Sequence, residues 1–306
     1  MEKIKMTVLP SSEGNVFKHL FESETAVYEA VVYKYKSFEE RTVVCISVQC
    51  GCAVGCVFCG TGNKFVRNLS PTEIIQQVDK VFKYHNINTK KVKKLQIMFM
   101  SMGEPMYNYN NVHWAIHSLH DLYPNAQLLL STSGANKRNE TWIELLQDSI
   151  SCDKIGLQFS IHASNDELRD KIIPHQNKKN LEELRNYGML WHDMTGRQVY
   201  LNYCVNSNNA GDKEFKELTS MFPPKYFAFT FSVICSKDET MKDAGYRELD
   251  KIKAFADRFL EAGYNTRVFD PAGQDDIGGG CGQLFFVQKK MQEKIDAIND
   301  ESNCIG

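Results

Sequence analysis

Residues 43–59 read VVCISVQCGCAVGCVFC and hold five of the ten cysteines in a chain of 306 residues. Cys52, Cys56 and Cys59 follow the spacing C-x3-C-x2-C. Its chance expectation anywhere in a chain with this many cysteines is about 0.01, so coincidence is a poor explanation. Three thiolates on one short loop can hold three irons of a [4Fe–4S] cluster and leave the fourth iron without a protein ligand. The spacing therefore predicts an iron–sulfur cluster with one open iron.

A structural zinc site is the alternative for the same loop, with Cys45 or Cys50 as the fourth ligand. Zinc ribbons usually bring two separated cysteine pairs, a pattern that this stretch lacks. Disulfide pairing would not explain the crowding in a cytosolic chain. An open iron can instead chelate the amino and carboxylate groups of a small molecule, as S-adenosylmethionine (SAM) offers. The colour of the protein distinguishes a cluster from a zinc site, because an iron–sulfur protein is brown.

The composition outside this stretch is that of an ordinary globular protein, with 42% hydrophobic and 24% charged residues. No window approaches the ~18 apolar residues of a membrane span, and residues 1–10 lack the apolar core of a signal peptide. We expect a cytoplasmic protein that does not enter a membrane. The formal net charge of −2 gives no general attraction to nucleic acid, so such binding would need a local basic patch.

Downstream of the cysteines, short apolar runs alternate with helical patterns. Ser70 as N-cap, Pro71 at the first helical position and Glu73 three residues after the cap form a capping-box signature. Six strand–helix units of this kind predict a parallel sheet bent into a partial (β/α)6 barrel of the TIM type. The predicted strands are 43–48, 95–100, 127–130, 155–161, 198–204 and 226–234, and the helices are 70–84, 111–122, 137–150, 180–194, 212–222 and 247–263.

Polar motifs follow the predicted strands at the end where a parallel barrel carries its chemistry. Residues 102–105 (MGEP) follow the second strand, 131–134 (STSG) end the third and 160–162 (SIH) end the fourth. Each motif alone is typical of a turn or a helix cap, but their common placement with the cysteine loop predicts one site. At the N-terminus, residues 26–35 alternate as a strand and should pair with residues 41–48 as a hairpin. We therefore divide the chain into an extension and hairpin (1–40) and a barrel core with a tail (41–306).

The cysteine loop resembles the radical SAM superfamily, whose C-x3-C-x-aromatic-C signature has its aromatic residue at Phe58. Within that superfamily the chain is similar to the RlmN/Cfr branch of RNA adenine methyltransferases. The similarity is nearly continuous from residue 45 to 174 and returns at 275–284 (DDIGGGCGQL). A cysteine seven residues before the motif, together with Cys-Gly-Gln-Leu near the C-terminus, is specific to this branch.

The resemblance implies a methyltransferase that uses two SAM molecules per turnover. Adenine C2 is electrophilic and cannot accept a methyl group by polar transfer, so radical chemistry is needed. Cys281 would receive a methyl group from one SAM, and a second SAM on the open iron would supply the radical that activates this S-methylcysteine. Cys45 would release the product by attacking Cys281 to form a disulfide. Glu29 would accept the ring proton.

The resemblance also implies SAM contacts at the strand ends. Gly103 and Glu104 would receive the SAM amino group, and Ser131 would face the ribose or the sulfonium. The ribose and carboxylate region would lie against Ser160, Ile161 and His162. For His162 the alternative is a satisfied core histidine. The implied partners are rRNA or tRNA and an electron donor of the flavodoxin or ferredoxin type.

Two other functions stay open. Only residues 1–25 precede the hairpin, which leaves no room for the accessory N-terminal RNA-binding domain of the full-length family. The same methyl-cysteine chemistry could therefore act on a non-RNA or small nucleotide substrate. A non-catalytic iron–sulfur protein for electron transfer or binding is the third possibility, although it would have no use for the thiol pair Cys45 and Cys281.

Overall fold

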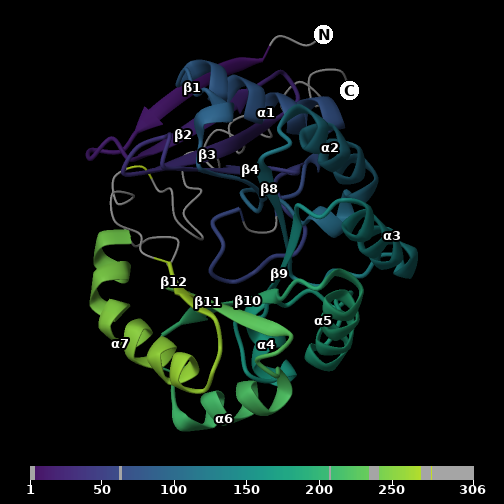
Figure 1. The fold of residues 1–306 in the computed structure, drawn as a ribbon, viewed down its shortest axis with the longest axis vertical. Coiled ribbons are helices and arrows are strands. Elements are labelled where there is room, and N and C mark those ends of the chain that lie inside the picture. The colour runs from purple at the N-terminus through teal and green to yellow at the C-terminus, as the bar shows by residue number, and fades with distance from the viewer. Residues whose placement is uncertain (1–3, 62–63, 207, 234–240, 270–276, 278–306) are drawn as a thin grey trace, which may run out of the picture.

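The computed structural model describes residues 4–61, 64–206, 208–233, 241–269 and 277. Ten of the described strands form one continuous sheet with the order β1-β2-β3-β4-β7-β8-β9-β10-β11-β12. The sheet curves into an open ring, and the helices cover its outer surface (Figure 1). Its strands are β1 (Lys5–Pro10), β2 (Val16–Glu22), β3 (Val27–Tyr35), β4 (Arg41–Ile46), β7 (Lys94–Phe99), β8 (Ala126–Thr132), β9 (Ile155–Ser160), β10 (Val199–Val205), β11 (Phe227–Val233) and β12 (Thr266–Val268).

Pairing from β4 to β12 is parallel throughout, which confirms the predicted partial barrel. All six predicted strands are present, with ends that differ by at most two residues. β12 adds a seventh parallel strand that we did not predict. It has only three residues, too few to show a periodic pattern.

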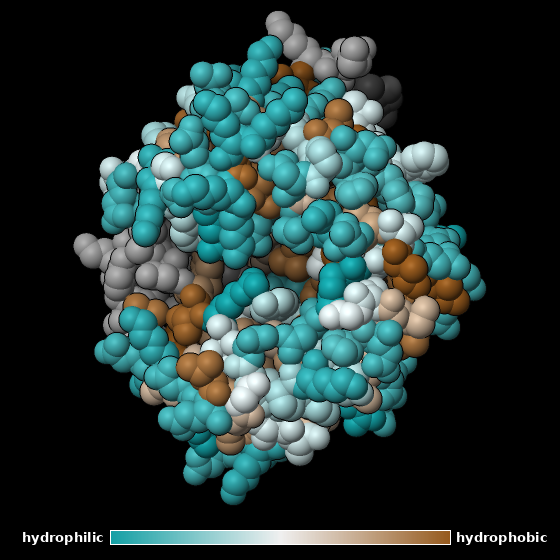
Figure 2. Space-filling view, in the orientation of Figure 1, coloured by the Kyte–Doolittle hydropathy of each residue, from teal (hydrophilic) through white to brown (hydrophobic). Residues whose placement is uncertain are grey.

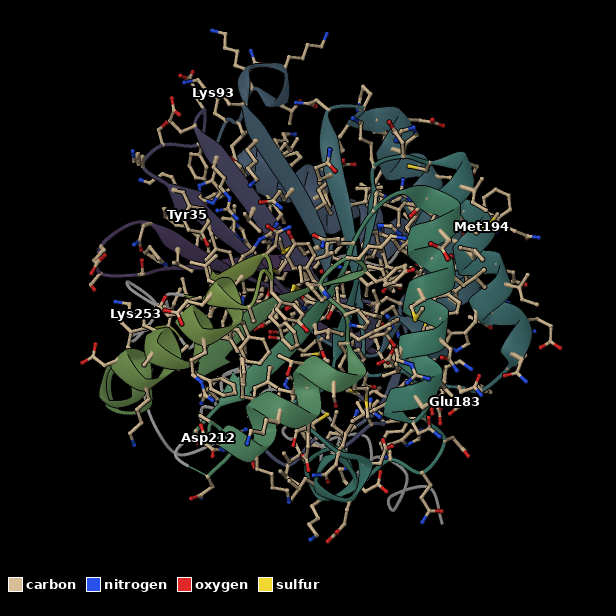
Figure 3. The ribbon with its side chains drawn as sticks, turned by 60° about the horizontal axis from the view of Figure 1, so that its bottom comes forward. Tyr35, Lys93, Glu183, Met194, Asp212 and Lys253 are labelled. Atoms are coloured by element: carbon tan, nitrogen blue, oxygen red, sulfur yellow. The ribbon has the colours of Figure 1, made fainter. Side chains whose placement is uncertain are left out.

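The helices alternate with the strands as predicted, and α4 is the one described α-helix that we missed. α1 begins with the expected capping box, in which Ser70 and Glu73 bond each other's backbone N–H groups. Side chains from the strands fill the centre of the ring, whereas Glu183 and Met194 of α5 lie on the outer layer (Figure 3). The α-helices are α1 (Pro71–Tyr84), α2 (Tyr109–Leu122), α3 (Asn139–Ser151), α4 (Asp166–Ile172), α5 (Leu181–Thr195), α6 (Asp212–Met221) and α7 (Met241–Glu261), and the 3₁₀ helices are Thr89–Lys91 and Pro105–Tyr107.

The predicted hairpin is confirmed, since β3 and β4 are antiparallel with Ala30 opposite Ile46 and Tyr35 opposite Arg41. Its second strand ends at Ile46 rather than at residue 48. The two further strands β1 and β2 extend the sheet beyond the hairpin and were not predicted. In β2 the polar Lys18 and the imidazole of His19 are fully buried, so the strand lacks the polar and apolar alternation of a half-exposed strand.

Among the described residues, no helix is both long and apolar enough to cross a membrane. Leu20, Val27 and Tyr28 of the N-terminal strands share one hydrophobic core with residues of the barrel strands and helices.

Candidate active site

The cysteine loop is tied at its base by two short strands, β5 (Gln49–Cys50) and β6 (Arg67–Asn68). Cys50 pairs with Arg67 and Gln49 with Asn68, so the loop leaves and returns at one point. Gly51 at this base has φ +78°, and a Cβ there would lie 1.5 Å from the carbonyl oxygen of Lys64. Only glycine lets the two ends of the loop approach this closely.

The three cysteines of the motif are half-buried on this loop, as a set of cluster ligands requires. The loop is held by backbone bonds from Cys59 to Cys56 (3.0 Å) and from Val57 to Ile172 (3.0 Å). Burial raises the pKa of the Cys52 thiol to about 12, and the neighbouring Cys59 acts in the same direction. The Cys52 thiol therefore holds its proton at neutral pH. A cysteine binds metal as the thiolate, so binding of a metal cluster would displace that proton.

Cys50 does not fit the alternative role of fourth zinc ligand. Its side chain is 1% exposed in the core, and its thiol donates to the carbonyl oxygen of Val27 at 3.2 Å. Without Cys50, the loop itself offers three thiols, the number that a [4Fe–4S] cluster with one open iron needs, while Cys45, the other candidate for the fourth zinc ligand, lies on β4. Phe58, the aromatic residue of the motif, packs edge-on against His162 with ring centroids 4.9 Å apart.

Gly103 and Glu104 follow β7 next to the cysteine loop. Gly103 has φ +98°, and a Cβ there would lie 2.6–2.8 Å from the Cβ, Cγ and backbone nitrogen of Gln49. The Glu104 carboxylate is buried and accepts hydrogen bonds from the hydroxyls of Thr132 (2.6 Å) and Ser133 (2.7 Å). It also accepts from the backbone N–H groups of Ser133 (2.8 Å) and Met106 (3.1 Å). The carboxylate thus fastens the loop after β7 to the end of β8, and the backbone N–H of Glu104 is itself held by the side-chain oxygen of Gln49 at 2.8 Å.

Ser131, Ser160, Ile161 and His162 lie where β8 and β9 end, as predicted. The Ser131 hydroxyl accepts from the Gln158 amide at 3.0 Å. The backbone N–H groups of Ile161 and His162 both donate to the carbonyl oxygen of Asn202.

His162 is the most constrained of these residues. It has φ +56°, and its Nδ1 accepts from the backbone N–H of Cys204 at 3.2 Å. Burial lowers its pKa to about 3, so the ring is neutral. These contacts are those of a satisfied core histidine, and the ring supports Phe58 of the cysteine loop.

A cavity of about 530 Å³ lies inside the ring of strands. Glu29 from β3, Cys45 from β4 and Cys59 from the cysteine loop all line it, so the structure brings three of the predicted residues together. Figure 2 shows this face of the molecule hollowed near the centre of the ring. Cys281 lies outside the described residues.

Glu29 is fully buried and forms an ion pair with the equally buried Lys18 of β2, at 3.3 Å. The Ser101 hydroxyl donates to the other carboxylate oxygen at 3.3 Å. Burial raises the pKa of Glu29, and the charge of Lys18 opposes that rise. Cys45 lies opposite Val31 on the neighbouring strand, two residues from Glu29. Its pKa is raised to about 12 by burial and by the negative charge of Glu29, so its resting form is the neutral thiol.

Sequence reasoning missed several residues of this cavity, because none of them belongs to a recognisable motif. Lys18 lies in a strand that we did not predict, and Gln158 and Asn202 are isolated amides within apolar strands. Cys152 and Cys204 are buried thiols outside the cavity, 2% and 0% exposed. The missed residues that line the cavity or bond Glu29 are Lys18, Tyr33, Arg41, Ser101, Gln158, Asn202 and Arg267.

Comparison with known proteins supports the fold and the cysteine motif. Residues 46–197 match the profile of the Radical SAM superfamily. A dual-specificity RNA methyltransferase RlmN from Magnetococcus marinus is 32% identical over 258 residues, which span 80% of this chain and 67% of the relative. A probable dual-specificity RNA methyltransferase RlmN from Dictyoglomus turgidum is 34% identical over 289 residues, which span 92% of this chain and 79% of the relative.

Solved structures show the same architecture. A radical SAM methyltransferase from Sphaerobacter thermophilus superimposes with a TM-score of 0.74 and 25% identity, over 92% of this chain and 81% of that one. SuiB from Streptococcus suis bound to S-adenosylmethionine shares the fold at a TM-score of 0.54 and 12% identity, over 76% of this chain and 51% of that one.

Proposed function

Because the chain belongs to the RlmN family of radical SAM methyltransferases, we propose that it methylates an adenine carbon of RNA, with C2 as the position and rRNA or tRNA as the substrate. The names of the relatives describe RNA methyltransferases of dual specificity. The observation that carries the proposal is the shared cavity in which Glu29, Cys45 and Cys59 meet. A carboxyl group and a thiol thus stand beside the loop that would hold the cluster.

The cysteine loop fits the cofactor that the superfamily uses. When bound, a [4Fe–4S] cluster supplies the electron that cleaves SAM to a carbon-centred radical. Cys52, Cys56 and Cys59 would be its protein ligands, and the turn at Gly103 brings the loop after β7 against Gln49 at the base of the cysteine loop. The backbone of Gly103 and Glu104 would take the SAM amino group, since the Glu104 carboxylate is occupied by Thr132 and Ser133.

Cys281 would carry the methyl group as S-methylcysteine, so each turnover consumes two SAM molecules, one as methyl donor and one as radical source. This residue lies in the glycine-rich stretch 278–282. Glycines there permit a close approach of backbone to substrate. A thiolate is the nucleophile that takes a methyl group from a sulfonium.

Release of the product would use the residues of the cavity. Once the radical adduct has given up its unpaired electron, for which the cluster would be the acceptor, Glu29 accepts the ring proton, for which it must be ionised. Cys45 then attacks the sulfur of Cys281, and the bond from that sulfur to the transferred carbon breaks. The electron pair stays on that carbon, which takes up a proton to become the methyl group, and Cys45 and Cys281 form a disulfide. A thiol-reducing system and an electron donor of the flavodoxin or ferredoxin type would restore the enzyme in a cytoplasmic setting.

The proposal is tested with anaerobically reconstituted protein, SAM and a reductant. The protein is incubated with rRNA, tRNA or free adenosine nucleotides, and the digested products are analysed for methyladenosines by mass spectrometry. We expect 2-methyladenosine in one of the RNAs and a methyl group on Cys281. Cys56→Ala should lose both the cluster and the product, whereas Cys152→Ala, at a buried thiol outside the loop, should keep both.

Methylation of free nucleotides but of neither RNA would replace the proposed substrate by a small one, which the net charge of −2 favours. The product 8-methyladenosine would change the position but keep the mechanism. Stoichiometric zinc without SAM cleavage would refute the proposal altogether.

A further inference from the structure

A second group of metal-ligating side chains lies on the outer helices. We propose that His113, His117 and Asp148 bind a divalent metal ion of the zinc class, which fastens α2 to α3. One ligand atom from each of the three lies within 4.8 Å of the others. Neither helix contributes a residue to the cavity of the candidate active site, and the two lie side by side on the outside of the ring (Figure 1).

The two histidines stand four residues apart on α2, so they share one face of the helix. His113 Nδ1 is 2.8 Å from one oxygen of Asp148, and His117 Nε2 is 3.0 Å from the other. A tetrahedral zinc ion with bonds of about 2.0–2.1 Å separates neighbouring ligand atoms by about 3.3 Å. To admit the ion, these two nitrogen–oxygen distances would lengthen by a few tenths of an ångström, and the two imidazole nitrogens, which lie within 4.8 Å of each other, would turn toward one centre.

The charge of Asp148 gives an independent reason for a cation at this place. Its side chain is 8% exposed, and among the described residues no lysine or arginine forms an ion pair with it. Its remaining partner is the neutral Tyr109 hydroxyl, which donates at 2.6 Å. A buried carboxylate without a cation is costly, and a divalent ion would compensate it.

The chemistry of the donors selects the class of ion. Imidazole nitrogens favour zinc and its transition-metal neighbours over magnesium or calcium, which prefer oxygen ligands. Three protein ligands leave a fourth position for water. Both imidazoles are 37% exposed, so the ion can reach them from solvent. A ring that binds the ion through the nitrogen facing Asp148 carries its proton on the opposite nitrogen, which is the form in which imidazole ligates metals.

The test uses protein with a reconstituted iron–sulfur cluster, so that iron occupies the cysteine loop. Equilibrium dialysis against buffered Zn²⁺, with iron and zinc counted per chain, should find one zinc in addition to the cluster. His117→Gln should weaken zinc binding at least about tenfold, since it removes a ligand. His120→Gln is the matched control, because His120 lies on the same helix outside the ligand group and should leave the affinity unchanged.

A second readout does not depend on counting metal. Zinc should raise the Tm of the parent protein and of His120→Gln but not that of His117→Gln, since an ion that binds the folded state stabilises it. Asp148→Asn should also lose the zinc. Because Asp148 is buried, Asp148→Asn could fail to fold. His117 is half-exposed, so His117→Gln still tests the site in that case.

Equal zinc content and equal Tm shifts in the parent and in His117→Gln would overturn the proposal. A Co²⁺ spectrum with thiolate-to-metal charge transfer would overturn it too, because that band places the ion on cysteines. Neither result bears on methylation, so this proposal and the proposed function can fail separately.

Discussion

Three ionisable side chains on neighbouring strands lie at or beside the cavity. Glu29 and Cys45 face it from β3 and β4, and Lys18 reaches Glu29 from β2. Burial favours the neutral form of the carboxyl group, and the ammonium group favours the charged form. The balance of these two effects sets the pH at which Glu29 can accept a proton.

Replacing Lys18 by Met should shift the pH dependence of methylation. Loss of the ammonium group raises the pKa of Glu29 further, so the acid limb of the rate profile should move to higher pH by about one unit or more. Lys34→Met is the matched control on the adjacent strand, since the Lys34 ammonium lies near the rings of Phe17 and Phe38. An unchanged acid limb in Lys18→Met, measured as initial rates from pH 5 to 9, would show that Glu29 is not the proton acceptor.

Replacing Cys45 by Ala should trap the reaction before release. Such a variant can still form the bond between Cys281 and the RNA, but it has no thiol at this position to break it. A covalent protein–RNA species should therefore accumulate on a denaturing gel and disappear after ribonuclease treatment. Cys204→Ala, at a buried thiol next to Ser232, should turn over without the adduct. Turnover by Cys45→Ala equal to that of the parent would remove Cys45 from the mechanism.

At the scale of elements, α1 holds the segment between β4 and the cysteine loop. Gln77 of α1 is fully buried, and its amide accepts from the backbone N–H of Ser47 and donates to the carbonyl oxygen of Ser47, each at 2.9 Å. These two bonds replace the ladder that β4 would otherwise continue, which explains why β4 ends at Ile46. The Ser47 hydroxyl in turn donates to the backbone carbonyl of Glu29 at 2.6 Å.

Gln77→Leu should destabilise the protein and loosen the cysteine loop. It leaves two buried backbone groups of Ser47 without partners, at a cost of roughly 2–4 kcal/mol. The free energy of unfolding is measured in urea, and the iron content after reconstitution reports on the loop. Gln76→Leu, at the half-buried neighbouring position of the same helix, should change the free energy of unfolding by less than about 1 kcal/mol. Equal stability of the two variants would contradict the role of Gln77.

At the scale of the whole molecule, the buried imidazole of His19 and the half-buried imidazole of His85 join the N-terminal strands to the barrel. His19 of β2 and His85 at the end of α1 face each other with 3.1 Å between their Nε2 atoms. Burial lowers the pKa of His19 to about 3 and that of His85 to about 4. The protein therefore folds with both rings neutral, although in the unfolded chain they would take up protons near pH 6.5.

The free energy of unfolding should accordingly fall as the pH drops from 6.5 toward 4. In this range the two imidazoles bind protons in the unfolded chain but not in the folded one. Above pH 6.5 the two rings are neutral in both the folded and the unfolded chain, so they no longer lower the free energy of unfolding. For His19 alone the loss by pH 4 is about 3 kcal/mol, from about 1.4 kcal/mol per unit of pKa difference. Urea unfolding at several pH values should show a shallower slope for His19→Gln than for the parent or for His192→Gln. An identical dependence of the free energy of unfolding on pH in all three proteins would contradict the conclusion that His19 and His85 are neutral in the folded state.

Much of this protein could be predicted from its residues alone, wherever the signal is local. The cysteine spacing, the capping box of Ser70 and Glu73, and the alternation of apolar strands with amphipathic helices each depend on neighbours within a few turns. They predicted the cluster loop, the parallel barrel and the hairpin of β3 and β4. The family resemblance named Glu29 and Cys45, which no local pattern would have found.

The tertiary structure decided which side chains meet in the cavity. Side chains alternate between the faces of a strand, so the register of β2 against β3 determines that Lys18 faces Glu29. Likewise, the parallel pairing of β7 with β8 brings the Glu104 carboxylate to the hydroxyls of Thr132 and Ser133, which donate hydrogen bonds to it. Pairing energies between distant strands leave no trace in the periodicity of either strand. The partners of a buried charge therefore follow from the fold, whereas the spacing of the cysteines alone predicts the cluster loop.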